Sequence, residues 1–198
     1  MNELTARLDA WLAANNSTRK IQVAMFAYNG TLEAPSASNL SATSYGTAQN
    51  PDYFYNGTNA EVRVIFAPVG ARYPLKLDDE LNQHKNTDKN AFSEETISEL
   101  LSDWVALGAN LDFWLYGTDF VNYLMPIDTI SNMQYNFQLL SRYGDGMMQL
   151  QLQTYAEKNV GTDWQRLKTY LAAELAKDVN AGVEELQANF MQAMYSAG

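Results

Sequence analysis

The sequence contains no cysteine and only one histidine among its 198 residues. Without cysteine the chain has no disulfide, no thiolate metal site and no cysteine nucleophile. A single histidine without a serine or cysteine nucleophile motif also argues against a conventional catalytic triad. The missing cysteine leaves the redox compartment open, because cysteine-free chains occur in reducing and oxidising compartments alike.

Basic residues are scarce as well, since 13 Lys and Arg stand against 23 Asp and Glu, giving a net charge of −10. Such a field repels phosphate backbones, so we expect no nucleic-acid partner. Apolar runs long enough to span a bilayer are also missing, and we expect no membrane insertion. No glycine-rich phosphate loop follows a strand pattern, and we therefore expect no nucleotide or other cofactor.

What the sequence does contain is an alternation of helix and strand patterns. Apolar runs bounded by turn residues predict about four strands, and apolar residues at helical spacing predict the helices between and around them. Ser93 is the predicted start of one helix and Gly108 its end, while Pro126 and Asp128 open the next helix and Gly144 closes it. The predicted strands lie near residues 21–30, 61–69, 110–117 and 146–153, and the helices near residues 4–12, 94–108, 126–144, 163–178 and 183–197.

This alternation predicts a single α/β domain over residues 1–198, with a parallel sheet covered by helices. A closed (β/α) barrel needs eight strands and about 250 residues. The chain is therefore interpreted as half of such a barrel, as a small open sheet, or as a half that pairs with a copy of itself.

Two long connections carry candidate functional residues. The first, residues 29–60, includes the aromatic stretch of Tyr53, Phe54 and Tyr55, which is interpreted as a ligand platform, a partner interface or, preferentially, a segment packed on its own domain. The second holds His84 close to three acidic residues, but the spacing fits no calcium loop, and we predict a polar loop without a metal.

Asp119 and Glu33 are the acidic residues placed just beyond strand ends, and they are the candidate catalytic pair. Both residues also fit a plainer interpretation, in which Asp119 is the polar edge of a turn and Glu33 a solvated loop acid. Aromatic residues at or beyond the strand ends are the candidate substrate-binding residues: Tyr28, Trp114, Tyr116 and Tyr73.

The segments IQVAMFAYNGTLEAP, VRVIFAPVGARYPL and LDFWLYGTDFVNYLMPIDTISNMQYNFQLLSRYG, followed by DWQRLKTYLAAELAKD, resemble, in this order, a bacterial domain of unknown function. That family is found in polysaccharide-degrading bacteria, often behind an α-glucuronidase-like N-terminal domain, and it resembles a glycoside hydrolase barrel. The resemblance implies that this chain is the C-terminal half of the barrel, that its partner is a carbohydrate, and that the protein is secreted or lies at the cell surface or in the periplasm.

Two departures from the family pattern bear on the chemistry. Tyr73 stands where the family usually has a histidine, and Gln149, Gln151 and Gln153 stand where it often has a glutamate. Because glutamine exchanges no proton at neutral pH, an acid or base role at the last strand is in doubt.

Two hypotheses follow. The first is a glycoside-hydrolase-like domain that hydrolyses or only binds a polysaccharide or oligosaccharide, with catalysis left open. The second is a non-catalytic scaffold or self-associating module, in which a second copy or the missing N-terminal half covers the exposed sheet edge.

Overall fold

The structure is a computed structural model that describes residues 1–35, 53–86, 91–122, 125–144, 148–151 and 161–195, with the backbone alone at 84–86, 91–94 and 148–151. The chain is a mixed α/β protein with a parallel sheet and helices, as the sequence predicts. The helices are α1 (Asn2–Ala14), α2 (Ile97–Ala106), α3 (Met133–Leu140), α4 (Gln165–Lys177) and α5 (Val183–Tyr195), and η1 (Asn29–Thr31) is a short 3-10 turn. The strands are β1 (Ile21–Tyr28), β2 (Ala60–Ala67), β3 (Gln83–Asn86), β4 (Ala91–Thr96), β5 (Asn110–Tyr116) and β6 (Met148–Gln151).

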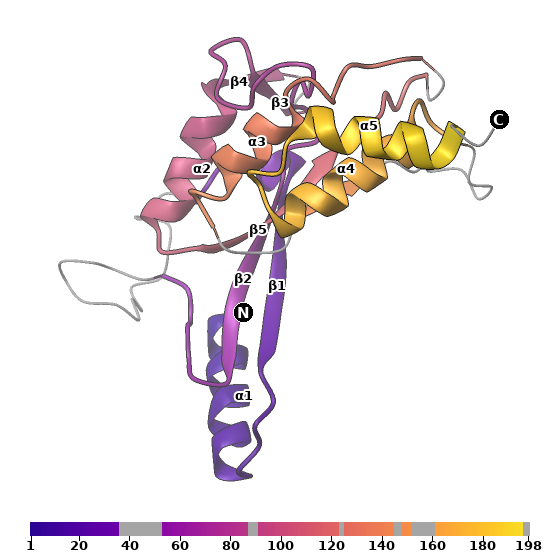
Figure 1. The fold of residues 1–198 in the computed structure, drawn as a ribbon. Helices are drawn as coiled ribbons and strands as arrows, with labels where there is room; N and C mark the ends of the chain where they lie inside the picture. The colour runs from indigo at the N-terminus through magenta and orange to yellow at the C-terminus, as the bar shows by residue number, and fades with distance from the viewer. Residues whose placement is uncertain (36–52, 87–90, 123–124, 145–147, 152–160, 196–198) are drawn as a thin grey trace.

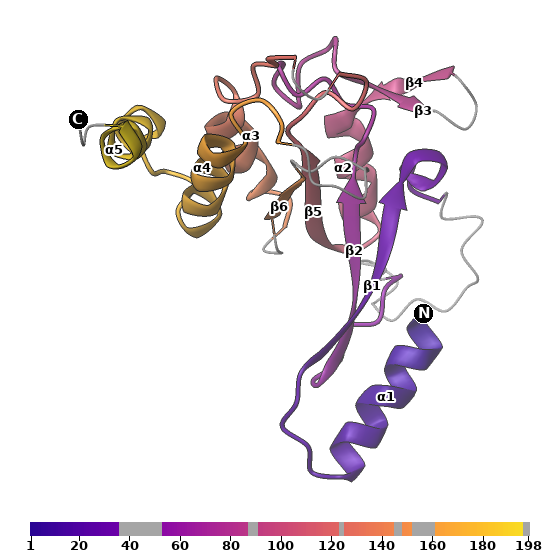
Figure 2. The ribbon, with the colours of Figure 1, turned by 90° about the vertical axis from the view of Figure 1, so that its right-hand side faces the viewer.

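The main sheet has the strand order β1-β2-β5-β6, and every neighbouring pair is parallel. The spatial order therefore follows the chain order without a reversal. Because crossovers between parallel strands are right-handed, such an order places the connecting helices on one face of the sheet. Figure 2 shows α2 behind β2 and β5, with α3 and α4 on the side of β6 and α5 outermost.

One face of the sheet, the covered face, forms the core against these helices. Val62, Val64 and Phe66 alternate along β2 and are completely buried. Leu111 and Phe113 continue this face on β5 and are also buried. The chain after α3 packs tightly on it, since a Cβ added to Gly144 would lie 2.8 Å from the carbonyl oxygen of Leu111.

No helix of the described residues covers the opposite face, which we call the open face. By register it consists of Gln22, Ala24, Phe26 and Tyr28 of β1, Glu61, Arg63, Ile65 and Ala67 of β2, and Asn110, Asp112, Trp114 and Tyr116 of β5. All four of its β1 residues are exposed. An antiparallel protein often exposes one sheet face, but parallel sheets normally have both faces covered.

Helix α1 lies apart from the other helices, at the ends where β1 and β2 begin (Figure 1). Its apolar spacing predicts a buried stripe, and that prediction is only partly right. Leu12 is buried, whereas Leu4 is 62% exposed and Trp11 is 60% exposed. The helix is attached through Asp9, whose carboxylate accepts hydrogen bonds from the N–H of Asn59 at 2.6 Å and of Ala60 at 3.0 Å.

The aromatic stretch before β2 packs on its own domain, in agreement with the preferred interpretation of the sequence. Phe54 is buried and lies 6.1 Å from the ring of Trp104. The Tyr55 hydroxyl donates to Asp9 of α1 at 2.9 Å. These side chains therefore connect α1, α2 and the sheet.

The predicted helix start at Ser93 is wrong, because residues 91–96 form β4 and pair antiparallel with β3. The true cap is Thr96: its hydroxyl accepts from the N–H of Glu99 at 3.3 Å, and the Glu99 carboxylate accepts from the N–H of Thr96 at 2.7 Å. The reciprocal pair satisfies two otherwise free donors of α2. Gly108, with φ of 77°, ends this helix as predicted.

The predicted start of the next helix at Pro126 and Asp128 is also wrong, because α3 begins only at Met133. The carboxylate of Asp128 instead closes a local turn by accepting from the N–H of Ile130 at 3.2 Å and of Ser131 at 3.0 Å. The Ser131 side chain and N–H hold the pKa of Asp128 below its usual value. A short acidic side chain thus competes with helix formation here, as it commonly does in turns.

Candidate functional site

The candidate site lies at the edge of the sheet where the parallel strands end, which we call the carboxyl edge. Tyr28 ends β1, Ala67 ends β2 and Tyr116 ends β5, and the register aligns these ends along one edge. In α/β sheets ligands bind beyond this edge, because the loops that leave the strands can vary without disturbing the core.

Aromatic rings on the open face lead up to this edge. The rings of Phe26 and Trp114 lie 5.7 Å apart, edge to face, although β2 separates their strands. The small side chain of Ala67, level with Trp114 in the sheet register, leaves room for this approach. Phe26 is 49% exposed and Tyr28 is 40% exposed, so the last residues of β1 present flat aromatic surfaces to solvent near the carboxyl edge.

At the same edge of the sheet, a hollow of about 460 Å³ opens between the loops that follow β2 and β5. The rings of Tyr73 and Tyr116 lie 6.1 Å apart, and those of Tyr116 and Phe120 lie 5.6 Å apart. Among the residues that line the hollow are Arg72, Tyr73, Tyr116, Thr118, Phe120 and Ile127.

Tyr73 is part of the wall of this hollow and not an exposed platform. Its side chain is buried, and its hydroxyl donates to the carbonyl oxygen of Pro68 at 3.0 Å. Burial, together with the neighbouring hydroxyl of Tyr116, raises the pKa of Tyr73 well above its usual value. A neutral, engaged phenol is poorly suited to acid–base chemistry near neutral pH.

Asp119 lies at the start of the loop that follows β5. Its Oδ1 accepts from the N–H of Val121 at 2.8 Å and of Asn122 at 3.3 Å, which is the pattern of a local turn. Its Oδ2 makes no hydrogen bond to any residue that the structure describes. The contacts of Oδ1 are those of the plainer interpretation, a turn residue, and they do not engage Oδ2.

Glu33 lies in different surroundings from Asp119. The preceding residue, Leu32, is buried and accepts a hydrogen bond from the indole N–H of Trp104 of α2 at 2.7 Å. The pKa of Glu95, next to α2, is raised chiefly by burial and further by the charges of Asp103 and Glu33. Glu33 thus lies near the acidic residues at α2.

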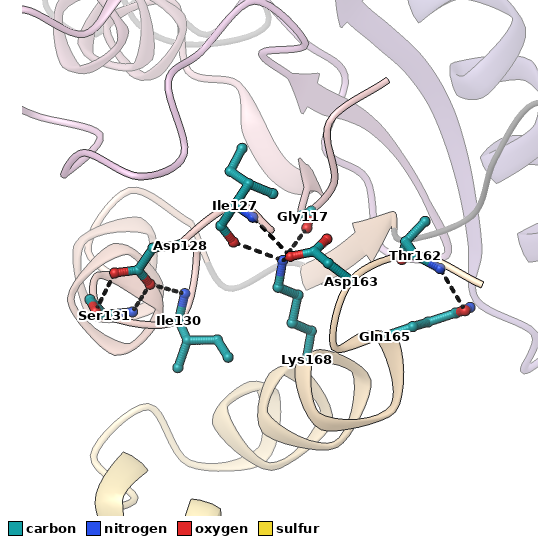
Figure 3. A network of polar contacts seen from close by, with 9 residues as sticks. All are labelled: Gly117, Ile127, Asp128, Ile130, Ser131, Thr162, Asp163, Gln165 and Lys168. Carbon is teal, nitrogen blue, oxygen red and sulfur yellow. Dashed lines mark hydrogen bonds and ion pairs between the residues drawn. The ribbon is translucent and has the colours of Figure 1, made fainter. Parts of the chain in front are cut away.

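The loop that carries Asp119 is held at both ends by one buried lysine of α4 (Figure 3). The Lys168 ammonium donates to the carbonyl oxygen of Gly117 at 2.9 Å and to that of Ile127 at 3.0 Å. It also forms an ion pair with Asp163 at 2.7 Å, and the Asp163 carboxylate accepts from the N–H of Ile127 at 3.0 Å. We call Asp163 and Lys168 the loop clamp.

The clamp is a functional feature that the predictions from sequence missed. Lys168 is completely buried, and it shares the buried side of α4 with Leu171 and Leu175. The spacing of these three residues places a lysine within an apolar helical stripe. Because lysine is rarely buried without a partner, this pattern could have identified Lys168 from the sequence. The partner could not be found in this way, because Asp163 precedes the helix and has the local sequence of an ordinary helix start.

A second polar group occupies the other end of the open face, near the starts of the strands. Arg63 is buried, forms an ion pair with Asp112 at 3.1 Å and donates to the carbonyl oxygen of Leu111 at 3.1 Å. Glu61 accepts from Gln22 at 2.8 Å and from Asn110 at 3.2 Å. These hydrogen-bonded side chains cross three strands, and we assign them a structural role.

Other predicted features can be placed briefly. Residues 83–86 form β3 in what the sequence predicts as the loop of His84. In the register, Gln149 and Gln151 pair with Trp114 and Tyr116, whereas Gln153 lies outside the described residues. Nowhere in the described ranges do three or more His, Asp or Glu residues gather closely enough to hold a metal ion. Every helix placed in the structure is too short or too polar to traverse a bilayer.

Comparison with known proteins identifies the family but no characterised relative. Residues 14–198 match the family model described as Domain of unknown function (DUF4838), and the chain belongs to this family. No curated protein and no solved structure matches the chain.

Proposed function

We propose that this chain of the DUF4838 family is a glycoside-hydrolase-like domain that binds, and in its complete assembly processes, a polysaccharide or oligosaccharide. The observation that carries the proposal is the set of aromatic side chains near the carboxyl edge. Phe26 and Tyr28 are exposed and Trp114 packs edge to face on Phe26, while Oδ2 of Asp119, in the loop that follows β5, has no hydrogen-bond partner among the described residues. Flat rings cover the apolar faces of sugars, and carboxylate oxygens accept hydrogen bonds from sugar hydroxyls.

The sheet topology supports a barrel as the complete architecture. A strand order that follows the chain order, with helices on one face, is the arrangement found in part of a closed (β/α) barrel. In a closed barrel the open face would be the interior, which would account for the polar group around Arg63 and Glu61 on that face. We propose that this chain is the C-terminal half of such a barrel.

The residues at hand support binding more directly than hydrolysis. Hydrolysis of a glycosidic bond requires two carboxylates at defined spacing. Glu33 lies beside α2, and Tyr73 holds a neutral, engaged hydroxyl. An active hydrolase would therefore combine Asp119 with a carboxylate from the missing half of the barrel or from a second chain.

A melting-temperature screen against glycans tests the proposal. Mono-, oligo- and polysaccharides, with uronic acids and N-acetylated sugars included, are added to the purified chain. A ligand that binds only the folded form stabilises it by about 2.7 kcal/mol at one hundred times its dissociation constant. Asp119→Ala should lose the shift, and Glu80→Ala, an exposed acid of another loop, should keep it. A cooperatively melting chain that responds to no glycan would contradict the proposal.

The alternative is a non-catalytic scaffold or self-associating module of a larger secreted bacterial protein. One observation favours it: β1 is an edge strand of eight residues without a charged side chain, and it has no partner on its outer side among the described residues. Natural proteins usually protect such edges with charges or cover them. Sedimentation of the chain as a monomer over a wide concentration range would argue against self-association.

A further inference from the structure

Trp164 has the least favourable backbone conformation among the described residues outside glycine. It lies immediately before α4 in the left-handed region, with φ of 49° and ψ of 27°. The other two non-glycine residues with positive φ are Asn16 and Asn29, and asparagine tolerates this region. A bulky aromatic residue gains no such local compensation, so the conformation of Trp164 is strained.

The surrounding hydrogen bonds impose this conformation on Trp164. Its carbonyl oxygen accepts from the N–H of Lys168 at 2.9 Å, the first bond of the helix. On either side of it, the N–H of Gln165 donates to the carbonyl oxygen of Thr162 at 3.3 Å, and the Gln165 side chain accepts from the N–H of Thr162 at 3.4 Å. Asp163, directly before it, is held by the buried ion pair of the loop clamp.

The contacts of the indole side chain do not offset the energetic cost of this backbone conformation. It is 57% exposed, and it forms no hydrogen bond or ring contact with any residue that the structure describes. Glycine or asparagine would adopt the same backbone at lower cost. Strained residues of this kind concentrate at functional sites, where the rest of the fold holds them in place.

Trp164 is connected to the candidate site through its neighbour in the chain. Asp163, its neighbour in the chain, contacts the backbone of Ile127, and Ile127 lines the hollow at the carboxyl edge. The clamp therefore ties Trp164 to the same loop that carries Asp119.

We infer that Trp164 is a ligand-contacting residue of this site, presented to solvent by the loop clamp as a rigid stacking surface for a sugar ring. Indole offers a broad apolar face for the C–H groups of the ring and an N–H that donates to a hydroxyl. The inference rests on the proposed carbohydrate function and adds a residue that neither the strand-end pattern nor the family comparison indicated.

The test combines three variants with two measurements. Trp164→Ala and Trp164→Asn remove the ring, and Trp11→Ala removes an equally exposed tryptophan of α1 at the other end of the sheet. Melting temperature without ligand reports on strain, and tryptophan fluorescence titration with a glycan that stabilises the wild-type chain reports on binding.

We expect Trp164→Ala and Trp164→Asn to weaken glycan binding about tenfold or more, as the loss of one good aromatic contact would. Trp164→Asn should melt about 2–4 °C higher than the wild type, because left-handed strain of the order of 1 kcal/mol is relieved. Trp11→Ala should leave the affinity unchanged.

The outcomes separate this inference from the proposed function. If a glycan binds the wild type and Trp164→Ala equally well, the role of Trp164 is refuted and the carbohydrate function stands. If Trp164→Asn melts lower than the wild type, the ring has a structural role and the inference is wrong. If no glycan binds the wild type, the proposed function fails, and the role of Trp164 fails with it.

Discussion

The two faces of the main sheet use apolar residues in opposite ways. On the covered face, Val62, Val64 and Phe66 are completely buried beneath the helices. On the open face, Phe26 and Tyr28 of the neighbouring strand keep about half of their surface in solvent. Burial of apolar area stabilises a fold wherever it occurs, and large exposed rings commonly mark interaction surfaces. The covered face therefore holds the domain together, whereas the exposed rings of the open face contribute less to the stability of the described part of the chain.

The largest expected difference between the faces comes from neighbouring residues of β2. Phe66→Ala should reduce the free energy of unfolding by about 3–5 kcal/mol, because it removes a fully buried ring and leaves a cavity. Ile65→Ala, on the open face, should cost only about 1 kcal/mol. Urea denaturation of both variants measures the two values. Equal losses in the free energy of unfolding would mean that the open face belongs to the core of this chain, and would contradict the distinction between the two faces.

A comparably large loss in the free energy of unfolding is expected when the loop clamp, which supports the carboxyl edge, is disrupted. Lys168→Met leaves the Asp163 carboxylate buried without its cation, which typically costs about 3–5 kcal/mol. Urea denaturation gives the loss, and the affinity of the variant for a stabilising glycan should fall with it, since the loop of Asp119 is released.

The control for the clamp is the double variant Lys168→Met/Asp163→Leu. Replacing both members of a buried ion pair with apolar residues avoids the unpaired charge, so most of the lost stability should return. Binding should not return, because Gly117 and Ile127 have still lost their shared donor. A double variant as unstable as the single one would mean that the ion pair itself is not the source of the effect.

A smaller and pH-dependent effect on stability is expected from Asp9, which attaches α1 to the segment just before β2. Backbone N–H groups, first that of Asn59, and the Tyr55 hydroxyl hold the pKa of Asp9 below its usual value. The unfolded state therefore binds more protons, and the contribution of Asp9 is present above its unfolded pKa and lost as the pH falls through its folded pKa. Asp9→Asn should lower the melting temperature near neutral pH and flatten its acid dependence. Glu3→Gln, an exposed acid of the same helix, should change neither.

The smallest effect is expected beside α2. Glu33 is among the charges that keep the pKa of Glu95 raised, after burial and Asp103. Glu33→Gln should lower the pKa of Glu95 in an NMR titration and stabilise the fold at neutral pH by less than about 0.5 kcal/mol, since solvent screens partly exposed charges. The gain should vanish in acid, where the carboxyls are protonated. An unchanged Glu95 titration would place Glu33 farther from α2 and reopen its pairing with Asp119.

The local sequence was sufficient for the α/β class and for most of the strands. Alternation such as that of Val62, Val64 and Phe66 is a property of neighbouring residues, and so is the glycine that ends α2. Helix starts were harder to predict, because Ser93 and Asp128 are residues of the capping type whose side chains or backbone found other partners. Asp128 closes a turn, and Ser93 lies within β4.

The sequence by itself determined the composition, the acidic charge, the order of the elements and the presence of an acid at the end of β5. Only the tertiary structure decided which residues meet: Lys168 with Gly117 and Ile127 across more than forty positions, and Phe26 with Trp114 across an intervening strand. It also brought Glu33 near Glu95 and held Trp164 in a strained conformation. The physical reason is that pairing, burial and strain depend on long-range contacts, which residue spacing along the chain does not specify.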